Sequence, residues 1–179
     1  MQLHRHPDSP PSPVEHIEAL ATHLPDGRLS LVFSATGDLQ RVRLPQARPQ
    51  ERADGLWRGT CLEAFVRGAG NASYFEFNLS PSGQWAAYRF EGHRSGMADA
   101  EVPAPIIRSA ASAAQFGLVA GIDVSALLEL GPLEIWEVGL SAVIEADDGS
   151  LSYWALAHPA GSPDFHHEAC FAATLPPIG

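Results

Sequence analysis

The stretch LWRGTCLEAFVRGAGNASYFEFNLSPSGQWAAYRF, residues 56–90, decides the predicted fold. Side chains of a strand point alternately to its two faces, and the segments TCLEAFV and YFEFNLS each fit this alternation, with QWAAYRF expected as the next antiparallel strand. One face is apolar and carries Leu62, Ala64, Val66, Phe75, Phe77 and Leu79. The other face carries Cys61, Glu63, Phe65, Tyr74, Glu76 and Asn78. With a turn at SPSG, the stretch predicts an antiparallel meander that has one apolar face and one mixed face.

Strand patterns continue along the rest of the chain. RLSLVF (28–33) and LQRVRL (39–44) predict a hairpin around ATGD, and residues 135–158 predict a second hairpin around DDGS. FGLVAGIDV (116–124) alternates strictly, and ACFAATL (169–175) predicts a last strand. About nine strands of this kind predict two packed antiparallel sheets, an all-β sandwich of the immunoglobulin-like or jelly-roll-like type.

The segments outside these strands set the predicted domain boundaries. Residues 1–26 begin with a run rich in Pro and His and predict an irregular N-terminal arm, followed by one domain over residues 27–179. Residues 91–114 predict a long, turn-rich loop of the kind that is often functional. SALLEL (125–130) predicts at most a short helix, which Ser125 would cap.

Charge and apolar content exclude two classes of partner. The 179 residues include 11 basic and 21 acidic ones, a formal net charge of -10, and no Lys/Arg cluster, so nucleic-acid binding is not expected. No apolar stretch is long enough for a secretory signal or a membrane span, so we expect a soluble, cytoplasmic protein without membrane contact. Cys61 and Cys170 are far apart in sequence and predict reduced core thiols; a bridge between strands is the alternative.

Four blocks of the sequence resemble the DOMON-like superfamily, in the branch similar to family 9 carbohydrate-binding modules. In order they are DGRLSLVFSATGDLQRVRLP, LWRGTCLEAFV, YFEFNLSPSGQWAAYRFEGHRSGM and SYWALAHPAGSPDFHHEACFAATL, and together they cover most of residues 27–175. The middle is the most specific part: a Trp six residues before a strand Glu, an aromatic-Glu-x-Asn strand, a Ser-Pro-x-Gly turn and a following Arg. The resemblance implies a DOMON-like β-sandwich that binds ligands on a concave side without catalysis.

The resemblance also implies roles for individual residues. In the sugar-binding relatives, aromatic rings clamp a sugar while carboxylate, amide and Arg side chains hold its hydroxyl groups. Trp57 matches the first clamp aromatic, Glu63 matches the strand carboxylate, and Arg94 matches the basic residue of a YR-like element, which reads HR here. Phe165 or His166 stands at the place of the second clamp aromatic, where the relatives have Trp.

The chemistry of the mixed face agrees with a sugar ligand. A sugar presents C–H groups on its ring faces and hydroxyl groups around its rim, so its site needs aromatic rings and polar side chains. The predicted set is Trp57, Glu63, Glu76, Asn78, Trp85, Tyr88 and Arg94, with Phe165 and His166. The alternative is that the two carboxylates are solvated and the tryptophans fill the core. Trp136 is assigned to the core by its apolar strand face, and Trp154 suits either place.

Metal and haem are the alternative ligands. His158, Asp164, His166 and His167 offer ligand atoms to a transition metal, but their spacing matches no familiar signature, so no metal residue is predicted. Calcium is compatible with ADDG at residues 146–149, which a hairpin turn explains equally well. Some DOMON relatives bind haem through Met and His, and Met97 leaves this open, although no export signal accompanies it. The predicted cofactor is therefore none.

Three further alternatives concern activity and assembly. Paired carboxylates such as Glu63 and Glu76 suit a glycosidase, but nothing in the sequence marks an acid of raised pKa, so a non-enzyme is predicted. A protein-interaction domain that has lost sugar binding is the other alternative. Exposed edge strands would permit a homodimer.

Overall fold

The computed structural model describes residues 1–24 and 26–177, and these residues form an all-β fold of antiparallel strands. The strands are β1 (Gln2–Arg5), β2 (Val14–His23), β3 (Leu29–Gly37), β4 (Cys61–Gly68), β5 (Tyr74–Leu79), β6 (Trp85–Phe90), β7 (Ala98–Asp99), β8 (Ile106–Ala111), β9 (Gln115–Ile122), β10 (Trp136–Glu145), β11 (Leu151–Ala155) and β12 (Ala173–Leu175). The helical elements in the described part are the short 3₁₀ turns η1 (Leu39–Arg41), η2 (Leu56–Arg58) and η3 (Glu168–Cys170). The predicted all-β class is confirmed.

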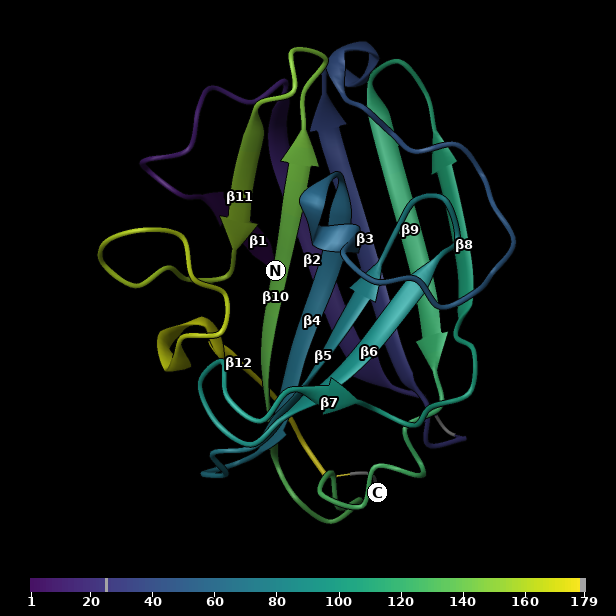
Figure 1. Cartoon of the computed structure of the whole chain (residues 1–179), viewed down its shortest axis with the longest axis vertical. Coiled ribbons are helices and arrows are strands. Elements are labelled where there is room, and N and C mark those ends of the chain that lie inside the picture. The colour runs from purple at the N-terminus through teal and green to yellow at the C-terminus, as the bar shows by residue number, and fades with distance from the viewer. Residues whose placement is uncertain (25, 178–179) are drawn as a thin grey trace.

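The strands make one strongly curled sheet with the order β7-β6-β5-β4-β10-β11-β1-β2-β3-β9-β8, and β12 pairs with β10. We call β4–β7 and β10–β12 the front half, and β2, β3, β8 and β9 the rear half. Figure 1 shows the front half lying over the rear half. Two separate sheets were predicted, but β1 pairs with both β11 and β2 and joins the halves into one sheet. The sandwich type and the DOMON-like assignment stay predictions.

The main core lies between the two halves. Alternate residues of the long strands point into it, as Phe33 of β3, Leu118 of β9 and Trp136 of β10 do. The meander is confirmed, because β4 pairs with β5 and β5 with β6, and Leu62, Ala64, Val66, Phe75, Phe77 and Leu79 all lie in this core. The hairpin around DDGS is also confirmed as β10 and β11. Trp154 joins the same core.

The predicted irregular arm over residues 1–26 is wrong. Residues 2–5 form β1 and residues 14–23 form β2, which is paired with β3 along its whole length. A register shift between Val14 and His16 interrupts the alternation of β2, and this irregularity hid the strand pattern. The sheet therefore begins well before residue 27. The predicted ranges 1–26 and 27–179 include residues 25, 178 and 179, which lie outside the described residues.

The predicted hairpin of residues 28–33 with 39–44 is also wrong. β3 is a central strand whose two edges are taken by β2 and β9, so residues 39–44 have no free edge to pair with. They form η1 and a single bridge from Val42 to Ala146 instead. The amphipathic pattern of this segment reflects packing of Leu39 and Val42 against the core.

Three smaller segments differ from prediction. The loop predicted for residues 91–114 contains β7 and the edge strand β8, in which Ile107 is the buried residue, so the apolar signal was weak. No helix forms at Ser125, because the Asp123 carboxylate accepts bonds from the Ser125 amide (3.0 Å) and hydroxyl (2.6 Å) and closes a turn. The last strand is shortened to β12, since η3 occupies residues 168–170.

Candidate functional site

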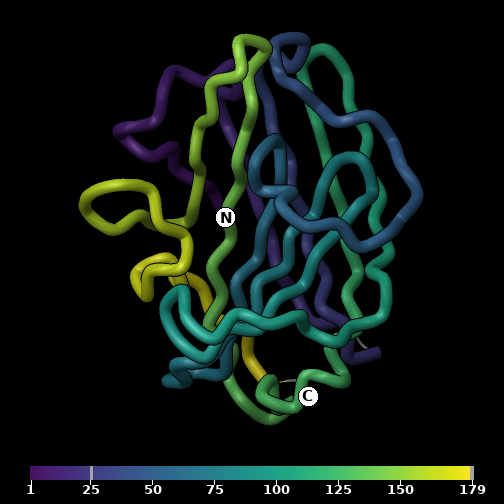
Figure 2. Tube along the Cα trace, in the orientation of Figure 1, coloured from purple at the N-terminus to yellow at the C-terminus, as the bar shows by residue number. Residues whose placement is uncertain are grey.

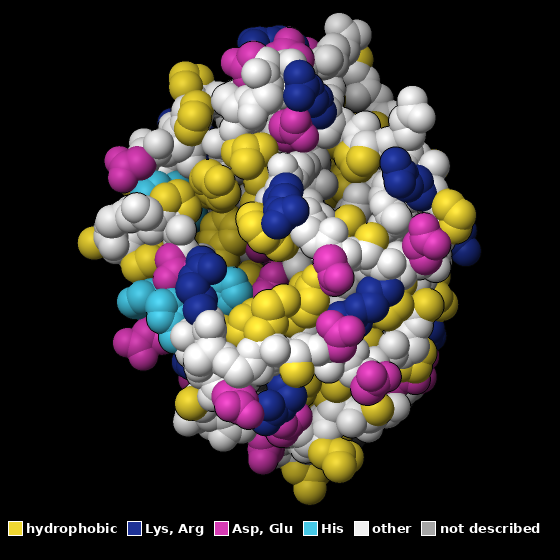
Figure 3. Space-filling view, viewed as in Figure 1, with side chains coloured by type: hydrophobic (Ala, Val, Ile, Leu, Met, Phe, Trp, Pro, Cys, Tyr) yellow, Lys and Arg dark blue, Asp and Glu magenta, His cyan; other side chains and the backbone are white. Residues whose placement is uncertain are grey.

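A cavity of about 480 Å³ opens on the face of the front half that lies opposite the core. We call this surface of β4, β5, β6, β10 and β11 the covered face, because loops cross it. Twelve residues line the cavity: Trp57, Glu63, Glu76, Tyr88, Phe90, Arg94, Met97, Val143, Tyr153, Pro163, Phe165 and His166. The space-filling view shows a hollow with hydrophobic walls and with acidic and histidine side chains beside it (Figure 3).

Two loops and one 3₁₀ turn cover this face. The loop of residues 91–97 and the loop of residues 156–167 lie side by side in the chain trace (Figure 2), and His93 and Arg94 of the first bond to Asp164 of the second. Both loops contribute residues to the lining of the cavity. η2 brings Trp57 to the cavity, and this ring is 47% exposed. The Arg58 guanidinium carbon lies 5.1 Å from the centre of the Trp57 ring and supports it by a cation–π contact. Three separate parts of the chain therefore cover the cavity.

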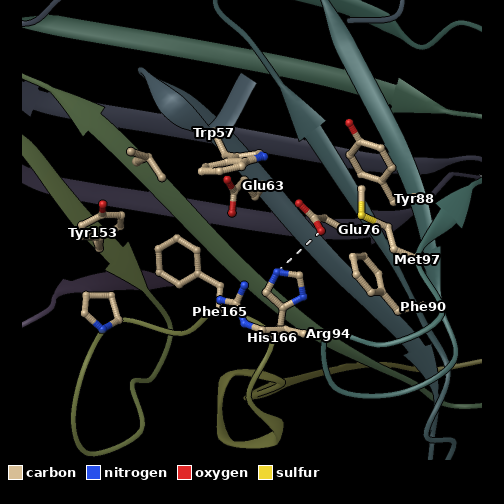
Figure 4. Close-up of a pocket in the computed structure, with 12 residues that line it drawn as sticks. Trp57, Glu63, Glu76, Tyr88, Phe90, Arg94, Met97, Tyr153, Phe165 and His166 are labelled. Atoms are coloured by element: carbon tan, nitrogen blue, oxygen red, sulfur yellow. Dashed lines mark ion pairs between the residues drawn. The ribbon is translucent and has the colours of Figure 1, made fainter. Parts of the chain in front are cut away.

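Two carboxyl groups, Glu63 of β4 and Glu76 of β5, form the floor of the cavity (Figure 4). In the register of these strands Glu63 lies opposite Asn78, and Glu76 lies opposite Phe65, so the two carboxyls are diagonal neighbours on one face. They are only 2% and 6% exposed. The Ser141 hydroxyl donates to Glu63 Oε2 (3.3 Å), and Asn78 Nδ2 donates to Glu76 Oε1 (2.7 Å). Each carboxyl thus accepts one hydrogen bond from another side chain.

Burial governs the protonation of this pair. Loss of solvent raises the pKa of Glu63 well above its usual range, and the nearby Glu76 carboxyl raises it further. Burial likewise raises the pKa of Glu76, against the hydrogen bond from Asn78 and the charge of Arg94, which lower it. The floor of the cavity therefore holds protons more tightly than exposed carboxylates do.

A polar network joins the floor to the covering loops. The Tyr74 hydroxyl and His166 Nδ1 are 2.8 Å apart, and His166 Nε2 faces Glu76 Oε2 at 3.8 Å. Burial and the charge of Arg94 lower the pKa of His166 to about 4, so the imidazole is neutral at pH 7. This neutral ring gives Glu76 no counter-charge.

Arg94 is held by the second loop. Its Nε and Nη2 both donate to Asp164 Oδ1, at 3.0 and 2.8 Å, while His93 Nε2 lies 2.7 Å from Asp164 Oδ2. Burial alone would raise the pKa of Asp164, but the hydrogen bonds from His93 and Arg94 outweigh it and lower the pKa. Arg94 also has a left-handed backbone, with φ of 52°. The loop pair is therefore fixed by an ion pair at a strained turn.

Most of the predicted site residues come together in this cavity. Those that line it are Trp57, Glu63, Glu76, Tyr88, Arg94, Phe165 and His166. Asn78 lies underneath, fully buried, and orients Glu76. Trp85 is a correction: it lies in the main core on the opposite face of β6. Residues three apart on a strand point to opposite faces, so Trp85 and Tyr88 cannot lie on the same face of β6.

Five lining residues were missed in the sequence, namely Phe90, Met97, Val143, Tyr153 and Pro163. Phe90 follows Tyr88 by two residues and could have been assigned by the same alternation. Val143 has the opposite parity to Trp136 on β10, so it also could have been placed on the covered face. Met97 and Pro163 lie on loops, where no periodicity signals their direction.

Other predicted features can be placed as well. Within residues 1–24 and 26–177, no group of three or more His, Cys, Asp and Glu side chains is arranged to hold a metal ion. No helix in that same part of the chain is long and apolar enough to cross a membrane. Cys61 and Cys170 are both buried and free.

Comparison with known proteins gives one informative likeness. No protein-family model and no curated protein matches the sequence. In three dimensions the chain is similar to the crystal structure of a "putative carbohydrate-binding protein" from Bacteroides uniformis ATCC 8492, with a TM-score of 0.63 and 18% identity. The match covers 89% of this chain and 77% of that one. At this identity the likeness establishes the all-β fold.

Proposed function

We propose that this protein is a non-catalytic carbohydrate-binding module that holds a mono- or oligosaccharide in the cavity of the covered face. The observation that supports the proposal is the pairing of aromatic walls with a buried carboxyl floor in a single cavity. The volume of about 480 Å³ is within the range of small-ligand sites. The similar structure from Bacteroides uniformis, by its name, supports a carbohydrate ligand as well.

The residues have distinct roles in this proposal. Trp57 stacks on one face of a sugar ring, since its indole is exposed beside the cavity, and Phe165 closes the other side. Glu63 and Glu76 accept hydrogen bonds from sugar hydroxyl groups on the floor. Arg94 donates from the rim, and its pairing with Asp164 fixes its position. Cytoplasmic location and homodimer formation stay predictions.

The arrangement of the carboxyls favours binding over hydrolysis. A glycosidase places its two carboxyl groups on opposite sides of the scissile bond. Glu63 and Glu76 instead project from adjacent strands into one floor, and both lie on the same side of any ligand in the cavity (Figure 4).

The test is a titration followed by intrinsic tryptophan fluorescence. Trp57 is the exposed indole, whereas Trp85, Trp136 and Trp154 are buried, so a bound sugar should change the emission of Trp57 above all. The panel consists of neutral, N-acetylated, acidic and amino monosaccharides and their disaccharides. We expect a saturable change for at least one member, which Trp57→Ala abolishes.

The matched control is Ile106→Ala. Ile106 is 52% exposed on β8, at the far edge of the rear half, so the substitution removes a comparable exposed apolar group away from the cavity. It should leave the titration unchanged. Both variants are checked by circular dichroism for an intact fold. Absence of a saturable response to every sugar, or equal loss in both variants, contradicts the proposal.

Haem is the second candidate, and one observation favours it: Met97 and His166 line the same cavity. The remaining residues fit it poorly. His166 Nε2, the nitrogen free to bind iron, faces Glu76 Oε2 at 3.8 Å, and the two floor carboxyls would lie against an anionic porphyrin. A hemin titration followed by visible absorbance decides the matter, because axial ligation by Met and His gives a sharp Soret band.

A further inference from the structure

The floor of the cavity has acceptor capacity that the protein does not use. Among the described residues no group donates a hydrogen bond to Glu63 Oε1 or to Glu76 Oε2. Both side chains belong to residues that are more than nine-tenths buried, and both point into the cavity (Figure 4). Both oxygens are open to the cavity and are not among the fully buried atoms without a partner, so an occupant of the cavity can reach them with a donor.

The cation beside the pair, Arg94, is shared with another carboxylate. Arg94 is the lining cation, and it commits two of its nitrogens to Asp164. His166 is neutral at pH 7, because burial lowers its pKa to about 4. The sequence contains no lysine, so an ammonium group cannot come from the chain's side chains. The Arg94 guanidinium thus acts on three carboxyl groups, those of Glu63, Glu76 and Asp164.

We propose that the ligand of this cavity carries an ammonium group, which Glu63 and Glu76 hold on the floor while aromatic rings of the wall surround it. The inference rests on the proposed function, and the ligand class it names is an amino sugar with a free amine. Trp57, Tyr88 and Phe90 offer ring faces or edges at the same cavity, which suits a cation next to aromatic groups. An ammonium group has three donors, enough for both vacant oxygens.

A proton accompanies this recognition. Burial raises the pKa of Glu63 and of Glu76, and a bound ammonium group would lower both by favouring the charged forms. The titratable and charged groups that face the pair are Cys61 of β4, Tyr74 of β5, Tyr88 of β6, Tyr153 of β11, and Arg94 and His166 of the covering loops. Binding of an ammonium ligand should therefore release a proton, whereas binding of a neutral sugar should not.

The experiment is isothermal titration calorimetry at pH 7 with glucosamine, glucose, N-acetylglucosamine and ethanolamine as separate probes. Glucosamine should bind at least about tenfold more tightly than glucose, as expected for hydrogen bonds between charged groups. Glu63→Gln and Glu76→Gln should each weaken glucosamine severalfold more than they weaken glucose. Glu15→Gln is the control, because Glu15 is an exposed carboxylate on β2 in the rear half.

The probes separate this inference from the proposed function. Glucose and N-acetylglucosamine binding as tightly as glucosamine overturns the ammonium inference and leaves carbohydrate binding intact. Ethanolamine binding without any sugar binding supports the ammonium site and overturns the sugar site. No binding by any probe overturns both.

Proton release gives an independent readout should a variant fail to fold. Calorimetry of the unmodified protein in buffers of different ionisation enthalpy measures it directly. Release of a substantial fraction of a proton with glucosamine, and none with glucose, supports the inference. Equal values for the two sugars overturn it.

Discussion

The rear half and the front half of the sheet treat their second faces differently. In β9 of the rear half the outward positions, including Val119, are exposed or half-buried, and the inward ones are buried. In β5 of the front half every residue is buried, although Glu76 and Asn78 are polar. Both strands alternate in sequence, so the difference comes from the loops that cross the covered face.

The difference between the halves concerns the free energy of burying polar side chains. Polar side chains on an outward face normally remain in water, where they cost nothing. The front half instead buries two carboxyl groups beneath loops that are joined by the ion pair of Arg94 and Asp164. Burial of carboxyl groups with too few donors is unfavourable. The ligand proposed above would offset this cost.

The largest expected effect tests the ordinary core that both halves share. Phe33 of β3 is 1% exposed and packs between the halves, so Phe33→Ala should lower the free energy of unfolding by about 3–5 kcal/mol. Urea denaturation followed by circular dichroism measures this loss. Val119→Thr, on the exposed face of the same half, should change it by no more than about 0.5 kcal/mol. Similar losses for both variants would mean that the two faces of the rear half do not differ as described.

The sequence alone was sufficient for the parts of the fold that follow strict alternation. The meander of β4–β6 and the hairpin of β10 and β11 were predicted, and the faces of β4, β5 and β10 were correct, because residues of period two must share a side. β2 was missed because its register shift breaks that period. The join made by β1 could not be predicted, since pairing between distant strands leaves no local signal.

The candidate site could be predicted from strand alternation for its strand residues and from the family resemblance for its loop residues. Glu63 and Glu76 were placed on one face by alternation, and that placement holds, whereas Trp85 was assigned by residue type against its own parity and lies in the core. Arg94, Phe165 and His166 were placed by the family resemblance, which supplied loop positions that alternation cannot reach. That these groups bind a ligand stays a prediction.

The next effect concerns the cost of the buried carboxyls. A carboxyl whose folded pKa is raised binds more protons in the folded state, so its contribution to stability is present below its unfolded pKa of about 4.3 and is lost as the pH rises toward the folded pKa. Glu63→Gln removes the titrating group, and with it the loss of stability as the pH rises. The variant should be more stable than the unmodified protein at pH 8 by about 1–3 kcal/mol, and the two should converge near pH 4.

Urea denaturation at a series of pH values measures the gap. His166 titrates in the opposite sense, because its pKa is lowered to about 4, so it adds stability as the pH rises from 4 to 6.5. This contribution is common to both proteins and cancels in their difference. Glu15→Gln, an exposed substitution, should give a flat difference. If the variant is instead less stable at pH 8, the Glu63 carboxyl has enough hydrogen-bond donors within the protein. Burial of this carboxyl in the front half would then not lower the free energy of unfolding.

The smallest effect concerns the loops that make the covered face. Asp164→Asn removes the charge that binds Arg94 and His93, so we expect a loss of about 1 kcal/mol at pH 7. The lowered pKa of Asp164 makes its contribution present above its unfolded pKa of about 3.9 and lost as the pH falls through the folded value. The loss should therefore vanish in acid. Hydrogen exchange should quicken at the His166 amide, which donates to Asp164 Oδ1, and not in β3.

Asp147→Asn provides the matched comparison for this loop anchor. Asp147 also pairs with an arginine, Arg41, but at 3.3 Å and with both side chains about half exposed, so its loss should be below about 0.5 kcal/mol. Hydrogen exchange on the covered face should not respond to it. If the two variants behave alike, the Arg94–Asp164 pair is only another surface ion pair, and something else must hold the loops over the buried carboxyls. If Asp164→Asn alone loosens the loop, the cover of the front half is a built feature, which is what a ligand cavity requires.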